Sequence, residues 1–325
     1  MAFSKNSGQR YRSFSGYLKE IFGCRVHKIS LDAGFTCPNR DGTRGIGGCI
    51  YCNNEAFSYN TARVRRPLEE QIEQGIDYMR RRFRADKFIA YFQAYSSTYA
   101  PLEKLKNTYD LVKSHSGIVG LFISTRPDCV PDPVLDLIAS YRGKYLTWLE
   151  LGLQSSSDLT LERLNRGHTV AEFSSAVTRA KARGIPVTAH VILGLPGETR
   201  KEMLETADFL AGLGVEGVKI HALHLVKNTS LAEEYLARPF PLLGQGDYVS
   251  LVCDFLERIP PDAVVQRIAV DISRDMLVAP EWCAYKSRTA AAIEEELDRR
   301  DSRQGLLFSD PAQAHAADYG AGGHT

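Results

Sequence analysis

The segment LDAGFTCPNRDGTRGIGGCIYC, residues 31–52, decides how the rest of this chain is interpreted. Its cysteines, Cys37, Cys49 and Cys52, have the spacing C-x11-C-x2-C and follow a short alternating strand expected at 26–31. The glycines between the first two cysteines permit positive φ angles, so the loop can fold closely around a bulky group. Thiolates are the usual ligands of iron–sulfur clusters, and three of them leave one iron of a four-iron cluster open. The segment therefore predicts a [4Fe–4S] site that can bind a further molecule.

Two other interpretations of these cysteines stay open. A structural zinc site normally takes four Cys or His ligands in paired spacings, whereas this chain offers one C-x2-C pair, one distant cysteine and His27 as a poorly supported fourth ligand. A role without any metal is the second alternative. A disulfide framework is not expected in a chain of this length without a secretory signal. The remaining cysteines are expected to be small buried hydrophobes: Cys24, Cys129, Cys253 and Cys283.

The composition is that of an ordinary globular protein. The 325 residues are 44% hydrophobic and 24% charged, which allows one large α/β domain or two smaller ones. A formal net charge of +1 gives no global argument for a nucleic-acid partner. The sequence shows no signal-peptide pattern at its start and no apolar run near the roughly 18 residues of a membrane span. We therefore expect a cytoplasmic protein without a membrane partner.

The middle of the chain alternates between strand-like and helix-like segments. Strands are expected at 26–31, 88–92, 118–124, 146–151, 187–193 and 215–223. Helices are expected at 67–83, 102–114, 133–141 with Asp132 as N-cap, 171–183 closed by Gly184, and 201–213. About six successive β/α units predict a parallel sheet with helical crossovers, either an open doubly wound sheet or a partial or full barrel. Functional residues should then lie at the carboxyl ends of the strands.

The alternation stops near residue 225, which divides the chain into four expected parts. Residues 1–25 form an N-terminal lead-in and 26–225 form the core. Residues 226–300 form a C-terminal α/β extension, with helices near 232–236, 248–258 and 289–300 and a strand at 264–270. Residues 301–325, which end in a small, polar, Gly/Ala-rich stretch, are expected to be a disordered tail.

The cysteine segment resembles the radical S-adenosylmethionine (SAM) superfamily, in the longer-spaced form of the branch that includes the elongator catalytic subunit. The CPNRDGT stretch before GGC-x2-C is similar to the YhcC/YtqA group, and the likeness extends over roughly residues 10–290. It implies a partial (β/α)6 TIM-type barrel for 26–225. It also implies a [4Fe–4S] cluster on the three cysteines, with SAM cleaved reductively to a 5′-deoxyadenosyl radical. An external electron donor such as flavodoxin or ferredoxin is implied as well.

The resemblance also implies SAM contacts at three further motifs. In the last C-x2-C, Tyr51 takes the aromatic position that packs on adenine. In ELGLQSSSDLTLERLNRGH, residues 150–168, Gln154 and Arg166 have the spacing of the ribose and carboxylate contacts, and an Arg fork suits a carboxylate. In HVILGLPGET, residues 190–199, His190 occupies a polar ribose position. Gly194 and Gly197 of the same motif permit close approach to the adenine.

One motif departs from the superfamily pattern. Many members carry a GGE motif after the second strand, whose carbonyls receive the SAM amino group. Here QAYSSTYAP, residues 93–101, stands in that place. Backbone carbonyls need no particular side chain, so we expect Ser96, Ser97 and Thr98 to serve instead.

The substrate implied by the resemblance is tRNA, at the wobble uridine, converting a carboxymethylaminomethyl group to aminomethyl. Arginines at 63, 65, 66, 80, 81, 82 and 84 could follow phosphates, with Arg80 and Arg84 sharing a helix face, or could form an ordinary solvated face beside acidic residues. Candidate substrate contacts are His221, His224, Lys227 and Lys286. The alternatives are a radical SAM enzyme acting on a small metabolite and a non-catalytic iron–sulfur sensor. The motifs identify no catalytic side chain.

Overall fold

The computed structural model describes residues 8–57, 66–269 and 272–309. Its centre is a seven-stranded, wholly parallel sheet in the order β1-β2-β3-β4-β5-β6-β8. The strands are β1 (Val26–Leu31), β2 (Lys87–Phe92), β3 (Ile118–Thr125), β4 (Leu146–Gln154), β5 (Val187–Leu193), β6 (Gly217–Ala222) and β8 (Val264–Arg267). These strands confirm the α/β class and the expected β/α alternation.

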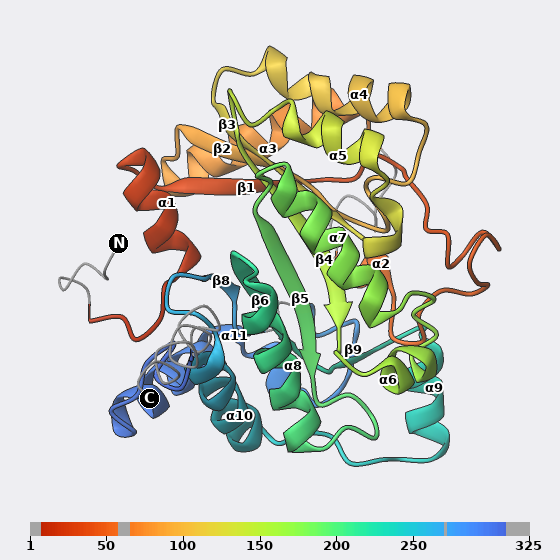
Figure 1. Cartoon of the computed structure of the whole chain (residues 1–325), viewed down its shortest axis with the longest axis vertical. Coiled ribbons are helices and arrows are strands. Elements are labelled where there is room, and N and C mark those ends of the chain that lie inside the picture. Colours follow the sequence, from red (N-terminus) through yellow and green to blue (C-terminus); the bar gives the residue numbers. More distant parts are fainter. Residues whose placement is uncertain (1–7, 58–65, 270–271, 310–325) are drawn as a thin grey trace, which may run out of the picture.

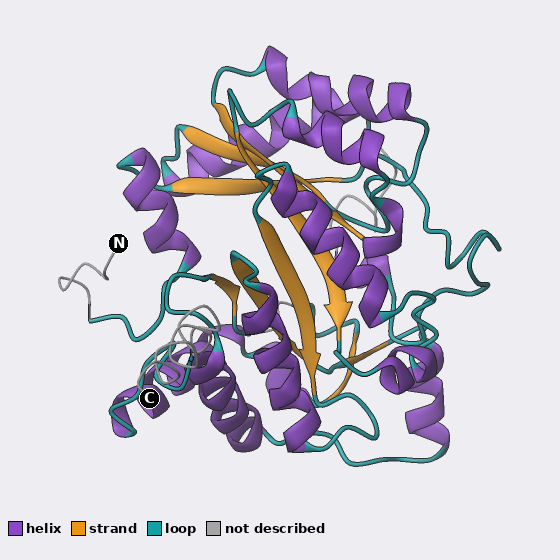
Figure 2. Cartoon of the chain, in the orientation of Figure 1, coloured by secondary structure: helices purple, strands orange, loops and turns teal. Residues whose placement is uncertain are grey.

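The sheet is curled into a half-barrel, which settles the architecture that periodicity left open (Figure 2). β1 and β8 are its two edge strands and are not paired with each other. The curl nevertheless brings their inner faces together, because Lys28 Nζ on β1 donates to Gln266 Oε1 on β8 at 2.6 Å. The partial TIM-type barrel is therefore confirmed, with strand carboxyl ends gathered at one rim.

Helices cover the outer face of this sheet and bury most of its apolar residues (Figure 1). Two of them begin with complete capping boxes, on Thr169 and Thr199, which satisfy N–H groups at the helix start. The helices are α1 (Phe14–Phe22), α2 (Asn54–Phe57), α3 (Leu68–Phe83), α4 (Leu102–Asp110), α5 (Asp132–Ala139), α6 (Asp158–Arg163), α7 (Val170–Ala182), α8 (Arg200–Leu213), α9 (Ser230–Ala237), α10 (Gln245–Arg258) and α11 (Lys286–Arg299). No helix of the described residues is long and apolar enough to cross a membrane.

The amino end of the barrel interior is closed by α1. Phe14 meets Phe122 edge-on at 5.7 Å between ring centroids, and Tyr17 meets Trp148 at 5.6 Å. These rings belong to a separate apolar cluster with Leu18 and Val264. The segment expected only as a lead-in therefore plugs one end of the barrel, and access is left to the other end.

The part of the chain beyond residue 225 differs from expectation in three ways. β8 joins the main sheet beside β6 as a seventh parallel strand, so the sheet continues past the six expected units. A two-stranded antiparallel sheet of β7 (Leu225–Val226) and β9 (Leu277–Ala279) lies next to it. Residues 301–309, expected in the disordered tail, pack on the molecule, because buried Gln304 donates to the Pro260 and Ala263 carbonyls. Residues 310–325 lie outside the described residues.

Three local expectations were wrong. Asp132 is the first residue of α5 rather than its cap, and its carboxylate accepts from Arg179 at 3.0 Å. The helix expected over 102–114 ends at Asp110 and continues as a 3-10 turn, Leu111–Ser114. Cys24 is exposed, whereas Cys129, Cys253 and Cys283 are buried as expected.

Candidate active site

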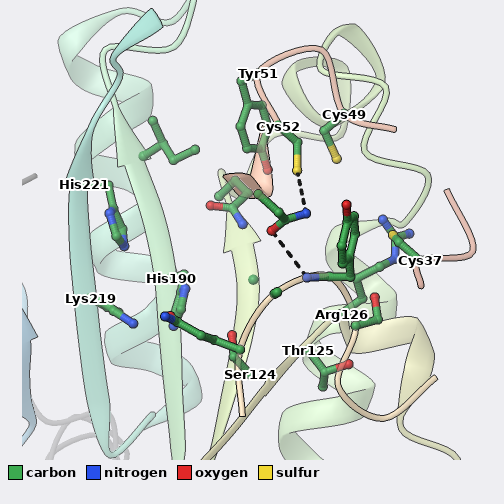
Figure 3. A pocket seen from close by; sticks show the side chains of 18 of the residues that line it. Cys37, Cys49, Tyr51, Cys52, Ser124, Thr125, Arg126, His190, Lys219 and His221 are labelled. Carbon is green, nitrogen blue, oxygen red and sulfur yellow. Dashed lines mark hydrogen bonds between the residues drawn. The ribbon is translucent and has the colours of Figure 1, made fainter. Parts of the chain in front are cut away.

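A cavity of about 480 Å³ opens at the carboxyl ends of the strands, inside the half-barrel. Its wall on one side carries Cys37, Cys49 and Cys52, and the opposite wall carries His190, Lys219 and His221 (Figure 3). A volume of this size is typical of small-ligand sites. The three cysteines predicted from their spacing therefore share one pocket.

The cysteine loop is held by its own turns and by the segment after α6. Arg40 N–H bonds the Cys37 carbonyl at 2.9 Å, and Cys52 N–H bonds the Cys49 carbonyl at 2.9 Å. Asn165 Nδ2 donates to the Gly48 carbonyl at 2.8 Å, where Gly48 has φ 85°. That positive φ requires glycine at the point where the chain turns back toward Cys49.

N–H donors are aimed at two of the sulfurs. Cys49 Sγ lies 3.5 Å from Arg166 Nη1 and 3.6 Å from Asn39 Nδ2, and Cys52 Sγ lies 3.6 Å from Asn54 Nδ2. Burial, together with the neighbouring Cys49, raises the pKa of Cys52 to about 12. A thiol with so high a pKa loses its proton only when a strong positive charge lies beside the sulfur, and coordinated iron provides that charge.

The donor set fits an iron–sulfur cluster better than a single ion. All three cysteines are free thiols, with Cys37 and Cys49 buried. Within the described part of the chain, no three His, Cys, Asp or Glu side chains converge on one metal-ion position. A cubane binds each thiolate at a different iron, so its ligands need not converge as zinc ligands do.

Gln154 and Arg166 line the same cavity as the cysteines, and their contacts with SAM stay a prediction. Gln154 ends β4 with φ 79°, a left-handed conformation that is strained for a residue with a side chain. Arg166 is buried and makes three contacts: besides Cys49, it donates to the Gly152 carbonyl at 2.9 Å and to His168 Nε2 at 2.9 Å, which leaves further N–H donors of its guanidinium unused. Burial alone would lower the pKa of Arg166, but its interactions with the neighbouring Tyr51 and Cys49 raise it, so the guanidinium stays charged.

The remaining predicted SAM contacts divide into two groups. Tyr51 and His190 line the cavity, together with Ile192 of the same β5 motif. Gly194 and Gly197 do not line it; they shape the turn after β5 at φ 90° and 89°. The closeness to adenine that the resemblance implies for these glycines stays a prediction.

The segment after β2 contains a feature that the sequence did not reveal. Ala94 and Tyr95 adopt positive φ angles of 80° and 55° and line the cavity. Glycine tolerates this backbone and other residues do so at a cost, which is the kind of strain found at functional sites. Ala94 and Tyr95 therefore adopt the backbone conformation that suits the two glycines of a GGE motif. They directly precede Ser96, which also lines the cavity.

A layer of polar side chains inside the barrel was also missed. Glu150 is fully buried, with Oε1 2.7 Å from Lys28 Nζ. Its Oε2 lies 3.0 Å from Lys219 Nζ, 2.8 Å from His190 Nε2 and 2.8 Å from Tyr91 Oη. In the sequence, Lys28 lies in VHKISL and Lys219 in GVKIHA, short strands in which other polar residues also occur, so nothing marks these lysines as members of a buried layer.

The pKa values of this layer reflect competition between burial and pairing. Burial raises the pKa of Glu150, but Lys219 and Lys28 outweigh it and hold that pKa well below its ordinary value. Burial lowers the pKa of Lys219 to about 7 despite Glu150, and burial with the charge of Lys219 lowers the pKa of His190 to about 4. At neutral pH His190 is therefore neutral and accepts or donates hydrogen bonds without adding charge.

The candidate substrate contacts are only partly brought together. His221 and His224 line the cavity, whereas Lys227 and Lys286 are absent from its wall. The helical spacing that would place Arg80 and Arg84 on one face does not apply, because α3 ends at Phe83 and Arg84 is its C-cap at φ 51°. Positions 63 and 65 lie outside the described residues.

Comparisons with known proteins agree with this geometry. The model of the Radical SAM superfamily matches residues 37–210, and that of the Radical_SAM C-terminal domain matches residues 215–299. The chain belongs to the radical SAM superfamily, and is thus an enzyme of the class that uses a [4Fe–4S] cluster and SAM. A non-catalytic sensor is therefore set aside.

Several individual proteins of known sequence or structure resemble this chain. The chain is 40% identical to YtqA of Bacillus subtilis, covering 93% of this chain and 94% of YtqA. It is 40% identical to YhcC of Escherichia coli, covering 91% and 94%. A tRNA-2-methylthio-N(6)-dimethylallyladenosine synthase of Fusobacterium nucleatum is 26% identical over 62% of this chain and 48% of its own. The archaeal Methanocaldococcus infernus Elp3, at 18% identity, has a TM-score of 0.64 over 86% of this chain and 64% of that chain, a likeness of fold.

Proposed function

We propose that this enzyme holds its cluster on Cys37, Cys49 and Cys52 and binds SAM between the cysteine wall and the ends of β4 and β5. The observation that carries this assignment is the placement of three free thiols on one wall of a cavity, with N–H donors directed at two of them. When bound, the cluster and SAM supply a 5′-deoxyadenosyl radical that abstracts a hydrogen atom. The SAM contacts are Tyr51, Gln154, Arg166 and His190, with Gly194 and Gly197 shaping the turn beside them.

The protein's own side chains have distinct tasks in this proposal. Arg166 and Asn39 donate to Cys49 and so stabilise its thiolate, a charge-assisted interaction stronger than a neutral one. The apolar cluster that includes Phe14, Tyr17 and Leu18 of α1 packs across the far end of the barrel, opposite the cavity mouth. Excluding water protects a reactive radical from side reactions. An external one-electron donor, such as flavodoxin or ferredoxin, would supply the electron that reduces the cluster.

The proposed substrate is the wobble uridine of a tRNA, whose carboxymethylaminomethyl group becomes aminomethyl. A wobble base lies in a single-stranded loop, so it can be turned out of the stack into a pocket at low cost. The cavity of about 480 Å³ opens at one rim, as such a mode requires. Arg40 is exposed and lines that opening, where a phosphate would pass. Support also comes from the relatives, one of which is named for a tRNA modification.

A second candidate is a small-metabolite substrate. It is favoured by the arrangement of the arginines: Arg66 is paired with Glu70 at 3.7 Å, and Arg84 lies outside α3 as its C-cap. Salt-dependent tRNA binding separates the two candidates, because RNA contacts weaken steeply with salt.

The test combines SAM cleavage with nucleoside analysis. The anaerobically reconstituted, reduced protein is incubated with SAM and tRNA containing carboxymethylaminomethyluridine. We expect 5′-deoxyadenosine formation to rise with this tRNA, and digestion to yield aminomethyluridine. SAM cleavage that tRNA does not accelerate, with no RNA binding at low salt, would reject the tRNA substrate while leaving the enzyme class intact.

A further inference from the structure

The polar layer inside the barrel has no counterpart in an ordinary barrel core. Barrel interiors are normally filled by layers of Val, Ile and Leu. Here the layer above the α1 plug contains Lys28, Tyr91, Glu150, His190 and Lys219, drawn from five strands. Burying charges costs free energy even when they are paired, so packing alone does not explain this layer.

The charges of the cavity wall are strongly unbalanced. The side chains that line it include six cations and, among the described residues, no carboxylate. Arg126 is compensated by Asp128 at 2.9 Å, Arg166 faces Cys49, and Arg40 lies at the opening. The cations are Lys28, Arg40, Arg126, Arg166, Lys219 and Arg267. Away from the cysteines, Lys28 and Lys219 share the buried carboxylate of Glu150, and Arg267 is the third cation on this part of the wall.

A β-bulge places the third of these cations. Val218 pairs with Val265, but Lys219 pairs with Arg267, so Gln266 is an extra residue on β8. Such bulges redirect side chains. Gln266 bonds Lys28, and Arg267 also lines the cavity, where its charge contributes to lowering the pKa of His221 and of Lys219. Within the described part of the chain, the Arg267 guanidinium forms no hydrogen bond or ion pair.

Lys28 is held in place rather than free to leave for solvent. Its ammonium lies 4.6 Å from the ring centroids of Phe14 and Tyr91 and 4.7 Å from that of Phe122. Lys219 lies 4.8 Å from the Tyr91 ring and is 6% exposed. Prearranged cations on a wall bind an anion without a further ordering cost.

We propose that Lys28, Lys219 and Arg267 form an anion subsite that binds the carboxylate at the end of the wobble-uridine side chain. The inference rests on the proposed function and specifies which group of that substrate the cavity recognises. The subsite lies on the wall opposite the cysteines, where Figure 3 shows Lys219 beside His190 and His221. The side chains of Lys28 and Lys219 are only 20% and 6% exposed, which favours the narrow end of a base side chain over a backbone phosphate tied to two riboses. An anion here would also favour the charged form of Lys219, whose pKa burial lowers to about 7.

The experiment compares two anticodon stem-loop RNAs that differ only in this charge. One carries 5-carboxymethylaminomethyluridine and the other its uncharged amide. Dissociation constants are measured anaerobically with the cluster-loaded full chain and SAM, for the wild type, Arg267→Gln, Arg267→Lys and Lys219→Met. Arg299→Gln serves as the matched control, because Arg299 is exposed on α11 and pairs with Glu296.

We expect the wild type to prefer the acid by roughly 10- to 100-fold, the range of one charged hydrogen-bond contact. Arg267→Gln and Lys219→Met should reduce the preference to near unity, whereas Arg267→Lys and Arg299→Gln should keep most of it. Equal weakening of both RNAs by Arg267→Gln would show that the anion is a phosphate and would overturn the proposal. A wild type that binds acid and amide equally would also overturn it, with tRNA binding, and so the proposed function, still standing.

Binding of the free nucleosides distinguishes a failure of the anion subsite from a failure of the proposed tRNA substrate. If neither RNA binds, titration with 5-carboxymethylaminomethyluridine and its amide replaces them. An acid preference that Arg267→Gln removes would support the subsite while rejecting the tRNA substrate. Binding of both nucleosides without preference, or of neither, would reject the subsite.

Discussion

Replacing the buried carboxylate of Glu150 by an amide, Glu150→Gln, should strongly destabilise the fold at low pH. Glu150 is 0% exposed and contacts Lys28 at 2.7 Å, Lys219 at 3.0 Å and Tyr91 at 2.8 Å. The amide keeps the shape but leaves two ammonium groups without a countercharge. Breaking one side of a buried ion pair costs about 3–5 kcal/mol. For a chain of this size that corresponds to a decrease in Tm of about 6–10 °C, at roughly 2 °C per kcal/mol.

The pH dependence of this cost has a definite sign. Burial lowers the pKa of Lys219 from 10.5 to about 7, so its charged form is disfavoured in the folded state. Its contribution to stability is therefore most unfavourable below pH 7 and is relieved as pH rises toward 10.5. Without Glu150 the pKa of Lys219 should fall further. The Lys219 part of the Glu150→Gln penalty should accordingly be larger at pH 6 than at pH 9, because it is lost as pH rises through about 7.

The assay is chemical and thermal unfolding of the full chain with thiols kept reduced, followed by circular dichroism at pH 6, 7.5 and 9. The double variant Glu150→Gln/Lys219→Met removes one unpaired ammonium and should recover part of the loss at pH 6. A penalty below about 1 kcal/mol at pH 6, or one that does not change with pH, would refute this account of the buried charges.

Three further predictions concern the cofactor wall and the turn after β5. Cys37→Ala, Cys49→Ala and Cys52→Ala should each abolish the cluster's absorbance and 5′-deoxyadenosine formation, while the exposed-cysteine control Cys24→Ala retains both. Arg166→Lys cannot reproduce the three bonds of the guanidinium, so KM for SAM should rise by roughly tenfold with iron content retained; an unchanged KM contradicts the assignment. Gly194→Ala forces a side chain to φ 90° and 2.9 Å from Leu243, which should cost about 1–3 kcal/mol in unfolding measurements, whereas Gly212→Ala, with open space, should not.

Much of this protein follows from local sequence. The spacing of Cys37, Cys49 and Cys52 predicts the cluster because its three thiolate ligands all lie in one short segment of the sequence. The strands and helices of the core match their predicted positions closely, for example β5 at Val187–Leu193, because burial periodicity is a property of neighbouring residues. The motif at 150–168 brings Gln154 and Arg166 into the cavity that holds the cysteines, and their contacts with SAM stay a prediction.

Only the tertiary structure decided the polar interior. Lys28 and Glu150 are 122 residues apart, and Tyr91 and Lys219 are 128 apart, so no local pattern links them. The curl of the sheet, the bulge that directs Arg267 inward and the closure by α1 bring these groups into one low-dielectric space. There their charges interact strongly and their pKa values shift, effects that depend on distance in space rather than on distance along the chain.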